Sequence, residues 1–395
     1  MTTASKAFKE YLHTRTKPVS VFDVSQLPEP YRSRYELYLE ATRLNLVRYI
    51  ETHRLDVDPE RVHVGFVAHP RLNAWAVEPN GFHFIGINAA LPCLVDRLWN
   101  MVLARTPALP SIGRAPTKID PVWSLPPNPS WVSEEEDVGS EELVEDILDA
   151  CEFGVPEDED RARFAAEMAS LTTMFALFHE SGHLLAGHSA RMNELGLQDG
   201  VVELDDGGTG QRVPDDRHAW ELIADHYAFE TLMLRLNSTE LLKGSSPLAS
   251  RWWREANAAD VPMKNEAEIA VVTAAMSALF LLFVAGETGA TPTHPHPFVR
   301  LSFLVLQERH VLPTSAGPEG RIVSDMAWAA LSQVWAGFRM LGMPTLVTPE
   351  FPKVRSTLKA LEVRVLQSRK DLKHLSWDAR QRPTSELGSS AVMPP

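Results

Sequence analysis

Two histidines and a glutamate occur in one short stretch with the spacing of a metal site. The stretch FHESGHLLAGH contains His179, Glu180 and His183 in the order HExxH. Residues four apart on a helix differ by only about 40° in direction, so both imidazoles can face one metal ion. Zn²⁺ suits two neutral imidazoles and a carboxylate, and a fourth position then remains for water. The pattern predicts one zinc ion per chain, with Glu180 beside it as general base.

The third metal ligand must come from elsewhere in the chain. His188 lies about half a turn away from His179 on a continuous helix, so it is a poor ligand. Glu221 is the better candidate, because it lies among apolar residues of a second predicted helix, where a carboxylate needs a partner. Asp225, one turn later, can accept a hydrogen bond from a ligating imidazole and fix its tautomer. His218 is the rival ligand.

The elements that must position these side chains are mostly helical. Apolar spacing predicts a long helix over Glu159–Ser189 that includes HExxH, and a second one from about Asp216 to Leu236 that includes Glu221. Short β-prone runs separated by a turn at Glu78–Gly81 predict a small sheet. We therefore expect an α+β fold. The remaining predicted elements are helices at Pro30–Leu55 and about Leu94–Ala104, and strands at Val62–Ala68, Leu72–Val77 and Phe82–Ile87.

The segment 106–160 differs in composition from the rest of the chain. Seven prolines lie within 106–131, which excludes a helix or central strand there, and 134–160 holds fourteen Asp or Glu and no Lys or Arg. We interpret it as an insertion, either a solvated surface excursion or a lid over a cleft. The expected organisation is 1–105, N-terminal helix and small sheet within the catalytic domain; 106–160, insertion; 161–345, helical zinc-binding core; 346–395, C-terminal helix and loose tail.

Charge and composition exclude several classes of function. The 395 residues carry 38 Lys+Arg and 52 Asp+Glu, a net charge of −14 that argues against nucleic acid as the partner. Only two cysteines and no apolar signal-peptide core near the start favour a cytoplasmic protein. Ile269–Gly286 is an uncharged run of membrane-span length, but its alanines and flanking glutamates favour a buried helix, so no membrane partner is expected. The pattern leaves the oligomeric state open.

HExxH followed by ExxxD on a later helix resembles the gluzincin arrangement of the HtpX-like and type I CaaX prenyl protease family. Two further segments resemble motifs of that family. Asn73-Ala74-Trp75-Ala76 looks like its NAxA segment, and His294 with Arg300 matches its late HPxxxxR motif. The resemblance covers about Leu72–Ile87 and Glu159–Leu301. Because several strong membrane spans are missing, the chain is also similar, more loosely, to the cytoplasmic phage-exclusion Lit protease.

The resemblance implies a zincin-like metallopeptidase, predominantly helical, with the small sheet edging the active-site cleft. It nominates His294 as a donor to the tetrahedral oxyanion and Arg300 as a group that orients the cleft or pairs with a carboxylate. A protein or peptide substrate would bind in extended form along residues 73–76 as an added strand. The leading hypothesis is a zinc endopeptidase acting on a cytoplasmic protein, as a regulatory or phage-defence protease. The alternatives are a catalytically idle zincin fold used as a binding module, and a membrane-associated processing protease.

Overall fold

The computed structural model describes the parts of the chain that carry most of the predicted site. His294 and the helix predicted at Ile269–Gly286 are among the predictions that lie outside the described residues. The described residues are 3–15, 18–70, 73–110, 112–118, 140–196, 201–202, 216–237, 299–300, 303, 336–337, 339–341 and 351–380.

A small sheet forms from the predicted β-prone runs. Its strand order is β1-β3-β2-β4, with β1 (Val62–Val67) parallel to β3 (His83–Asn88) and β2 (Ala74–Val77) antiparallel to β3. The turn that joins β2 to β3 places Asn80 and Gly81 at positive φ, which matches the predicted hairpin. The two-residue strand β4 (Val201–Val202) pairs with β2 on its other side.

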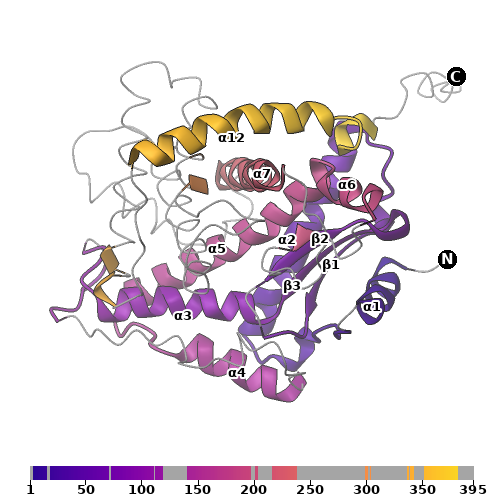
Figure 1. Ribbon diagram of the computed structural model, residues 1–395. Coiled ribbons are helices and arrows are strands. Elements are labelled where there is room, and N and C mark those ends of the chain that lie inside the picture. Colours follow the sequence, from indigo (N-terminus) through magenta and orange to yellow (C-terminus); the bar gives the residue numbers. More distant parts are fainter. Residues whose placement is uncertain are drawn as a thin grey trace, which may run out of the picture.

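Helices surround this sheet and make up most of the described structure, so the predicted α+β class is confirmed. In Figure 1, α5 crosses the molecule between α7 and α12 on one side and α3 and α4 on the other. The helices in chain order are α1 (Ala4–Thr14), α2 (Tyr31–His53), α3 (Ala90–Arg105), α4 (Ser140–Glu152), α5 (Glu159–Leu185), α6 (His188–Glu194), α7 (Arg217–Asn237) and α12 (Phe351–Asp371).

The central helix α5 begins at a well-formed cap and ends earlier than the sequence predicts. The side chain of Asp158 accepts a hydrogen bond from the backbone N–H of Arg161, which satisfies a free donor of the first turn. The predicted helix runs on to Ser189, but Gly187 adopts a left-handed φ of 81° and α6 starts anew at His188. Because the chain turns at this glycine, His188 points back toward the end of α5.

Arg161 ties the start of α5 to the loop that follows α3. Its guanidinium is buried and donates hydrogen bonds to five main-chain carbonyls, with no carboxylate among these acceptors. Burial lowers the pKa of Arg161 to about 10, although Asp158 opposes this shift. The five acceptors are the carbonyl oxygens of Leu103, Thr106, Ala108, Leu109 and Ile112.

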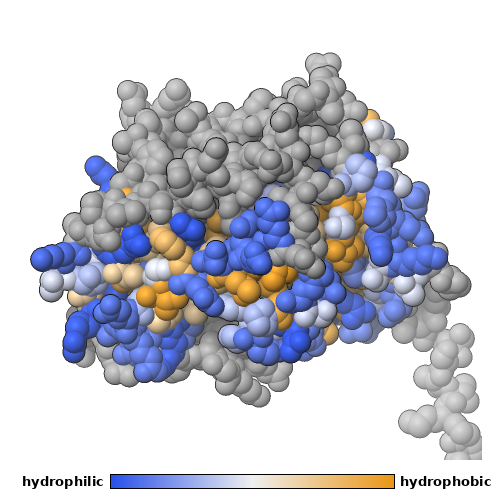
Figure 2. All heavy atoms as spheres, turned by 90° about the horizontal axis from the view of Figure 1, so that it is seen from below, coloured by the Kyte–Doolittle hydropathy of each residue, from blue (hydrophilic) through white to orange (hydrophobic). Residues whose placement is uncertain are grey.

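Part of the predicted insertion packs into the core. Helix α4 lies against α3, and its apolar side chains Leu143 and Ile147 are fully buried in the main hydrophobic cluster. Residues 119–139, where four of the seven prolines lie, are outside the described residues, so a lid at that place stays a prediction. Figure 2 shows that the underside of the molecule in Figure 1 carries many hydrophilic side chains, with hydrophobic residues in patches between them.

The C-terminal part extends the packing around α7 and reaches back to the sheet. Helix α12 packs on α7, and Trp377, in the short helix that follows, is fully buried with its ring edge-on to His83. Arg380 forms an ion pair with Glu78 at 2.8 Å. Part of the segment 346–395, expected to end in a loose tail, thus forms a short helix at Trp377–Arg380 that contacts the sheet. None of the helices among the described residues combines the length and apolar character needed to cross a membrane.

Candidate metal centre

The HExxH residues lie in the buried C-terminal part of α5. His179 and His183 are almost wholly shielded from solvent, and their Nε2 atoms are 3.0 Å apart. Burial lowers the pKa of His183 well below its usual value, so this imidazole is neutral, the form that binds a metal ion. The helix thus presents two adjacent nitrogen donors in the way that the four-residue spacing predicts.

Glu221 brings its carboxylate across from α7 to both imidazoles. Its Oε2 lies 3.2 Å from Nε2 of His179, and its Oε1 lies 3.6 Å from Nε2 of His183. Ligand atoms about 2.0–2.1 Å from a tetrahedral Zn²⁺ stand about 3.3–3.4 Å from one another. The three separations therefore fit one metal ion placed between the three donors. His218, the rival on the same helix, is only half-buried.

The close approach of α5 and α7 depends on Gly182. A Cβ at this position would lie 2.9 Å from the Cα and 3.0 Å from the carbonyl oxygen of Ala224 on α7. A larger side chain would force the helices apart, and Glu221, one turn before Ala224, would move with α7. The sequence analysis assigns this glycine no role. Its small size, directly before His183, was the available signal.

Glu180 completes the buried group. A carboxylate oxygen of Glu180 and one nitrogen each from His179 and His183 all lie within 4.8 Å of one another, and the Glu180 side chain is fully buried. Its carboxylate therefore lies in the same buried group as the two imidazoles. The arrangement therefore supplies three close donors and one nearby carboxylate that can take a proton.

Asp225 and Arg300 stand behind His179. The Oδ1 atom of Asp225 is 2.9 Å from Nδ1 of His179, and Arg300 donates to both carboxylate oxygens of Asp225, at 2.7 and 2.8 Å. Burial alone raises the pKa of Asp225, but the charge and hydrogen bonds of Arg300, together with His179, bring it below its usual value. The ionised carboxylate accepts the Nδ1 hydrogen of His179, so Nε2 is free to bind a metal. Arg300 also lies 3.7 Å from Glu221.

His188 has the corresponding place behind His183. Its Nδ1 lies 2.8 Å from Nδ1 of His183, and its ring stacks on Trp220 with centroids 5.2 Å apart and an interplanar angle of 7°. Burial lowers the pKa of His188 to about 3, so the ring is neutral. The sequence predicts that His188 is a poor ligand but does not predict this contact, which exists because the chain turns at Gly187.

The NAxA-like segment is linked through its main chain to α6, the helix that follows the HExxH helix. Ser189 donates a hydrogen bond to the carbonyl oxygen of Ala76, which links α6 to β2. Ala74 and Ala76 are fully buried, and Asn73 is half-buried just before the strand. The ring of Trp75 packs among Phe8 and other apolar side chains of α1 and β3, so it is part of a hydrophobic cluster.

The outer edge of β2 is already paired at two positions. Strand β4 takes Trp75 and Ala76 as its register partners, so that part of the edge expected to receive substrate is occupied by the chain itself. His294, the nominated oxyanion donor, lies outside the described residues. The structure thus brings together His179, Glu180, His183, Glu221, Asp225 and Arg300, and strand β2 contacts the helix α5 that carries three of them.

Comparison with protein families supports a peptidase. Residues 132–310, somewhat less than half of the chain, match the model of the peptidase U49 family, the metallopeptidase family of the Lit protease. The matched range includes all six residues that meet in the buried site. No curated protein matches the chain, and no solved structure does. The looser of the two resemblances is the one that this match supports.

Proposed function

We propose that this chain is a zinc-dependent endopeptidase that cleaves a cytoplasmic protein, in a regulatory or phage-defence role. The observation that carries the proposal is the position of Glu221, whose two oxygens lie 3.2 and 3.6 Å from the Nε2 atoms of His179 and His183. The match to the peptidase U49 family supports the same class of reaction. Zinc held by these three residues would polarise a water molecule and the scissile carbonyl group.

The chain's own residues have separate tasks in this reaction. Glu180 takes the proton of the attacking water on a carboxylate oxygen and passes it to the leaving amine. Asp225, held by Arg300, keeps the hydrogen of His179 on Nδ1. Burial excludes bulk water and strengthens the electrostatic interactions within the site. His294 is proposed as the oxyanion donor from the resemblance alone.

The substrate is proposed to be a protein segment in extended conformation beside residues 73–76. Such a segment would be recognised by hydrogen bonds between its main chain and that of the sheet edge. This mode of binding favours a protein substrate over a small molecule. Because β4 pairs with Trp75 and Ala76, the segment would extend the sheet at Asn73 and Ala74 or take the place of β4.

Metal analysis and cleavage assays test the proposal together. Glu180→Gln should retain one zinc per chain and lose cleavage, measured by mass spectrometry of new protein N-termini in cells expressing each form. Glu221→Gln should lower bound zinc. Glu194→Gln, the same change at an exposed residue of α6 paired with Arg191, serves as control and should behave as wild type.

Two results would contradict the proposal. Equal cleavage by Glu180→Gln would exclude the water-activation role of this residue. Bound zinc without any cleavage by the wild type would instead favour the idle binding module.

A further inference from the structure

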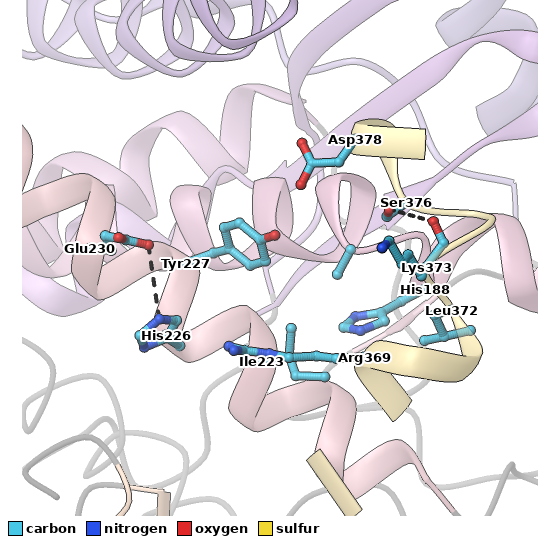
Figure 3. A pocket seen from close by; sticks show the side chains of 11 residues that line it. His188, Ile223, His226, Tyr227, Glu230, Arg369, Leu372, Lys373, Ser376 and Asp378 are labelled. Carbon is cyan, nitrogen blue, oxygen red and sulfur yellow. Dashed lines mark hydrogen bonds and ion pairs between the residues drawn. The ribbon is translucent and has the colours of Figure 1, made fainter. Parts of the chain in front are cut away.

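Helix α12 lies along the top of the molecule in Figure 1 and packs on α7, the helix that carries Glu221. Its buried side chains Leu361 and Val365 share a hydrophobic cluster with Leu222 and Ile223 of α7. Figure 3 shows Ile223 again, where it lines a cavity of about 300 Å³ between α7 and the end of α12. The packing of α12 against the described residues is therefore concentrated on this inner face.

The outer face of α12 carries the two most exposed large hydrophobic side chains among the described residues. Val363 is 68% exposed and Leu366 is 57% exposed. They are three residues apart, so they lie next to each other on the helix surface. Burial of these side chains contributes little to stability, and a β-branched valine is a weaker helix former than alanine. The fold of the chain therefore does not account for an apolar pair at this place.

Lysines extend the apolar pair into a stripe along the helix. Lys359, Val363, Leu366, Lys370 and Lys373 follow one another at intervals of four, three, four and three residues, and all are exposed. These intervals place them on one face and are those of the a and d positions of a coiled coil. Within the part of the chain that the structure describes, the side chains of the three lysines have no ion-pair partner. We call these five residues the outer stripe.

The outer stripe is opposite in charge to the protein as a whole. The chain carries a net charge of −14, whereas the stripe holds three cations and no carboxylate. Over residues 359–373 the exposed side chains include five Lys or Arg and two carboxylates, Glu362 and Asp371, of which Asp371 accepts a hydrogen bond from Gln367. Because salt screens distant charges within about 8 Å, this local excess of cations decides which partner is attracted.

We propose that the outer stripe binds an acidic amphipathic helix of a partner protein. Aliphatic side chains of that helix pack on Val363 and Leu366, and its flanking carboxylates pair with the lysines of the stripe. The apolar contact supplies the centre of the interface, and the ion pairs at its rim fix the register and speed association.

Three other occupants fit the outer stripe less well. A second copy of this chain, paired antiparallel about Val363 and Leu366, would set Lys359 against Lys370, and like charges repel. Nucleic acid would meet the lysines with its phosphates, but these offer no apolar surface to the exposed pair. An anionic membrane takes up a broad apolar helix face, and the main apolar face of α12 is already buried against α7.

Fluorescence anisotropy with a labelled synthetic peptide and the full-length chain tests the proposal. The peptide has about three heptads, with leucine and isoleucine at a and d, and glutamate at e and g so that it does not pair with itself. It should bind with a dissociation constant of about 100 µM or less at about 0.15 M salt. A peptide with lysine at e and g should bind at least about tenfold more weakly.

Variants of exposed side chains locate the binding site without disturbing the core. Leu366→Ser should weaken binding of the acidic peptide about tenfold, and Lys370→Gln should weaken it about threefold. Leu37→Ser on α2 and Lys9→Gln on α1 make the same changes at exposed positions elsewhere, and should alter the affinity less than about twofold.

Several results would overturn the proposal. These are the absence of saturation up to about 1 mM acidic peptide, equal weakening by Leu37→Ser, and equal binding of the lysine peptide. Duplex DNA and phosphatidylserine vesicles are titrated in the same way, and binding of either without binding of the peptide would assign the stripe to another class of partner. A dimer in sedimentation equilibrium that Leu366→Ser dissociates would assign it to a second copy. These measurements need neither zinc nor cleavage, so their failure would leave the proposed function standing.

Discussion

Replacing Asp225 with asparagine removes one negative charge from the group behind His179 without changing its size. In the metal-free protein, Arg300 then keeps its buried charge and loses the carboxylate that it contacts at 2.7 and 2.8 Å. Breaking a buried ion pair in this way costs about 3–5 kcal/mol of the free energy of unfolding. Loss of the carboxylate behind a ligating histidine lowers metal affinity about 10–100-fold, or about 1.4–2.7 kcal/mol.

Urea unfolding of the metal-free chain measures the first effect, and zinc competition with a chromophoric chelator measures the second. Adding Arg300→Leu to Asp225→Asn should restore part of the stability, because the buried charge that lost its Asp225 partner is removed. Zinc affinity should remain low, because an amide accepts the hydrogen of His179 more weakly than a carboxylate does. Asp371→Asn on the exposed surface of α12 is the matched control. A zinc affinity of Asp225→Asn within about twofold of wild type would refute the reasoning.

Three further changes test the packing and the titration of buried groups. Burial, with two nearby arginines, lowers the pKa of His83 to about 3, so the unfolded chain binds its proton first as pH falls below about 6.5. As the pH falls, this residue should therefore lower the free energy of unfolding by about 1.4 kcal/mol per pH unit. In urea titrations between about pH 5 and 6.5, His83→Gln should remove this contribution to the slope. An unchanged slope would contradict this. Gly182→Ala should destabilise the chain by about 1–3 kcal/mol and reduce bound zinc, because its Cβ meets the backbone of Ala224; normal zinc content would show that α7 adapts without moving Glu221. Arg161→Leu should cost at least about 3 kcal/mol in urea unfolding, because buried carbonyls lose their donors, and a loss below about 1 kcal/mol would show that water replaces them.

Local patterns predict most of the described elements and the residues that meet at the candidate site. The HExxH spacing places two histidines on one face of a single helical turn, and the apolar neighbours of Glu221 indicate a buried carboxylate. Both predictions follow from residues close together in the sequence. The hairpin at Asn80 and Gly81 likewise follows from turn chemistry, because both residues tolerate positive φ. These features depend on a few neighbouring residues and little else.

Contacts between distant segments were not predictable in the same way. The sequence predicts one helix through Ser189, because helix periodicity continues across Gly187 and only the fold shows that this glycine breaks it. Arg161 resembles a surface arginine at a helix start, yet it is buried by carbonyls contributed from the segment 103–112. Trp75 could equally be a pocket or core residue by pattern, and its packing against α1 decides the matter.

The segment after α12 also bears on the order in which the protein is completed during synthesis. A Cβ on Gly187 would lie 2.6 Å from the backbone of Leu375, so the turn that directs His188 toward His183 is backed by residues made almost two hundred positions later. Trp377 and Arg380 in turn rest on His83 and Glu78, which leave the ribosome three hundred residues earlier. The surroundings of the candidate metal site are therefore complete only after residues 375–380 have been made, and a nascent chain lacks this support until then.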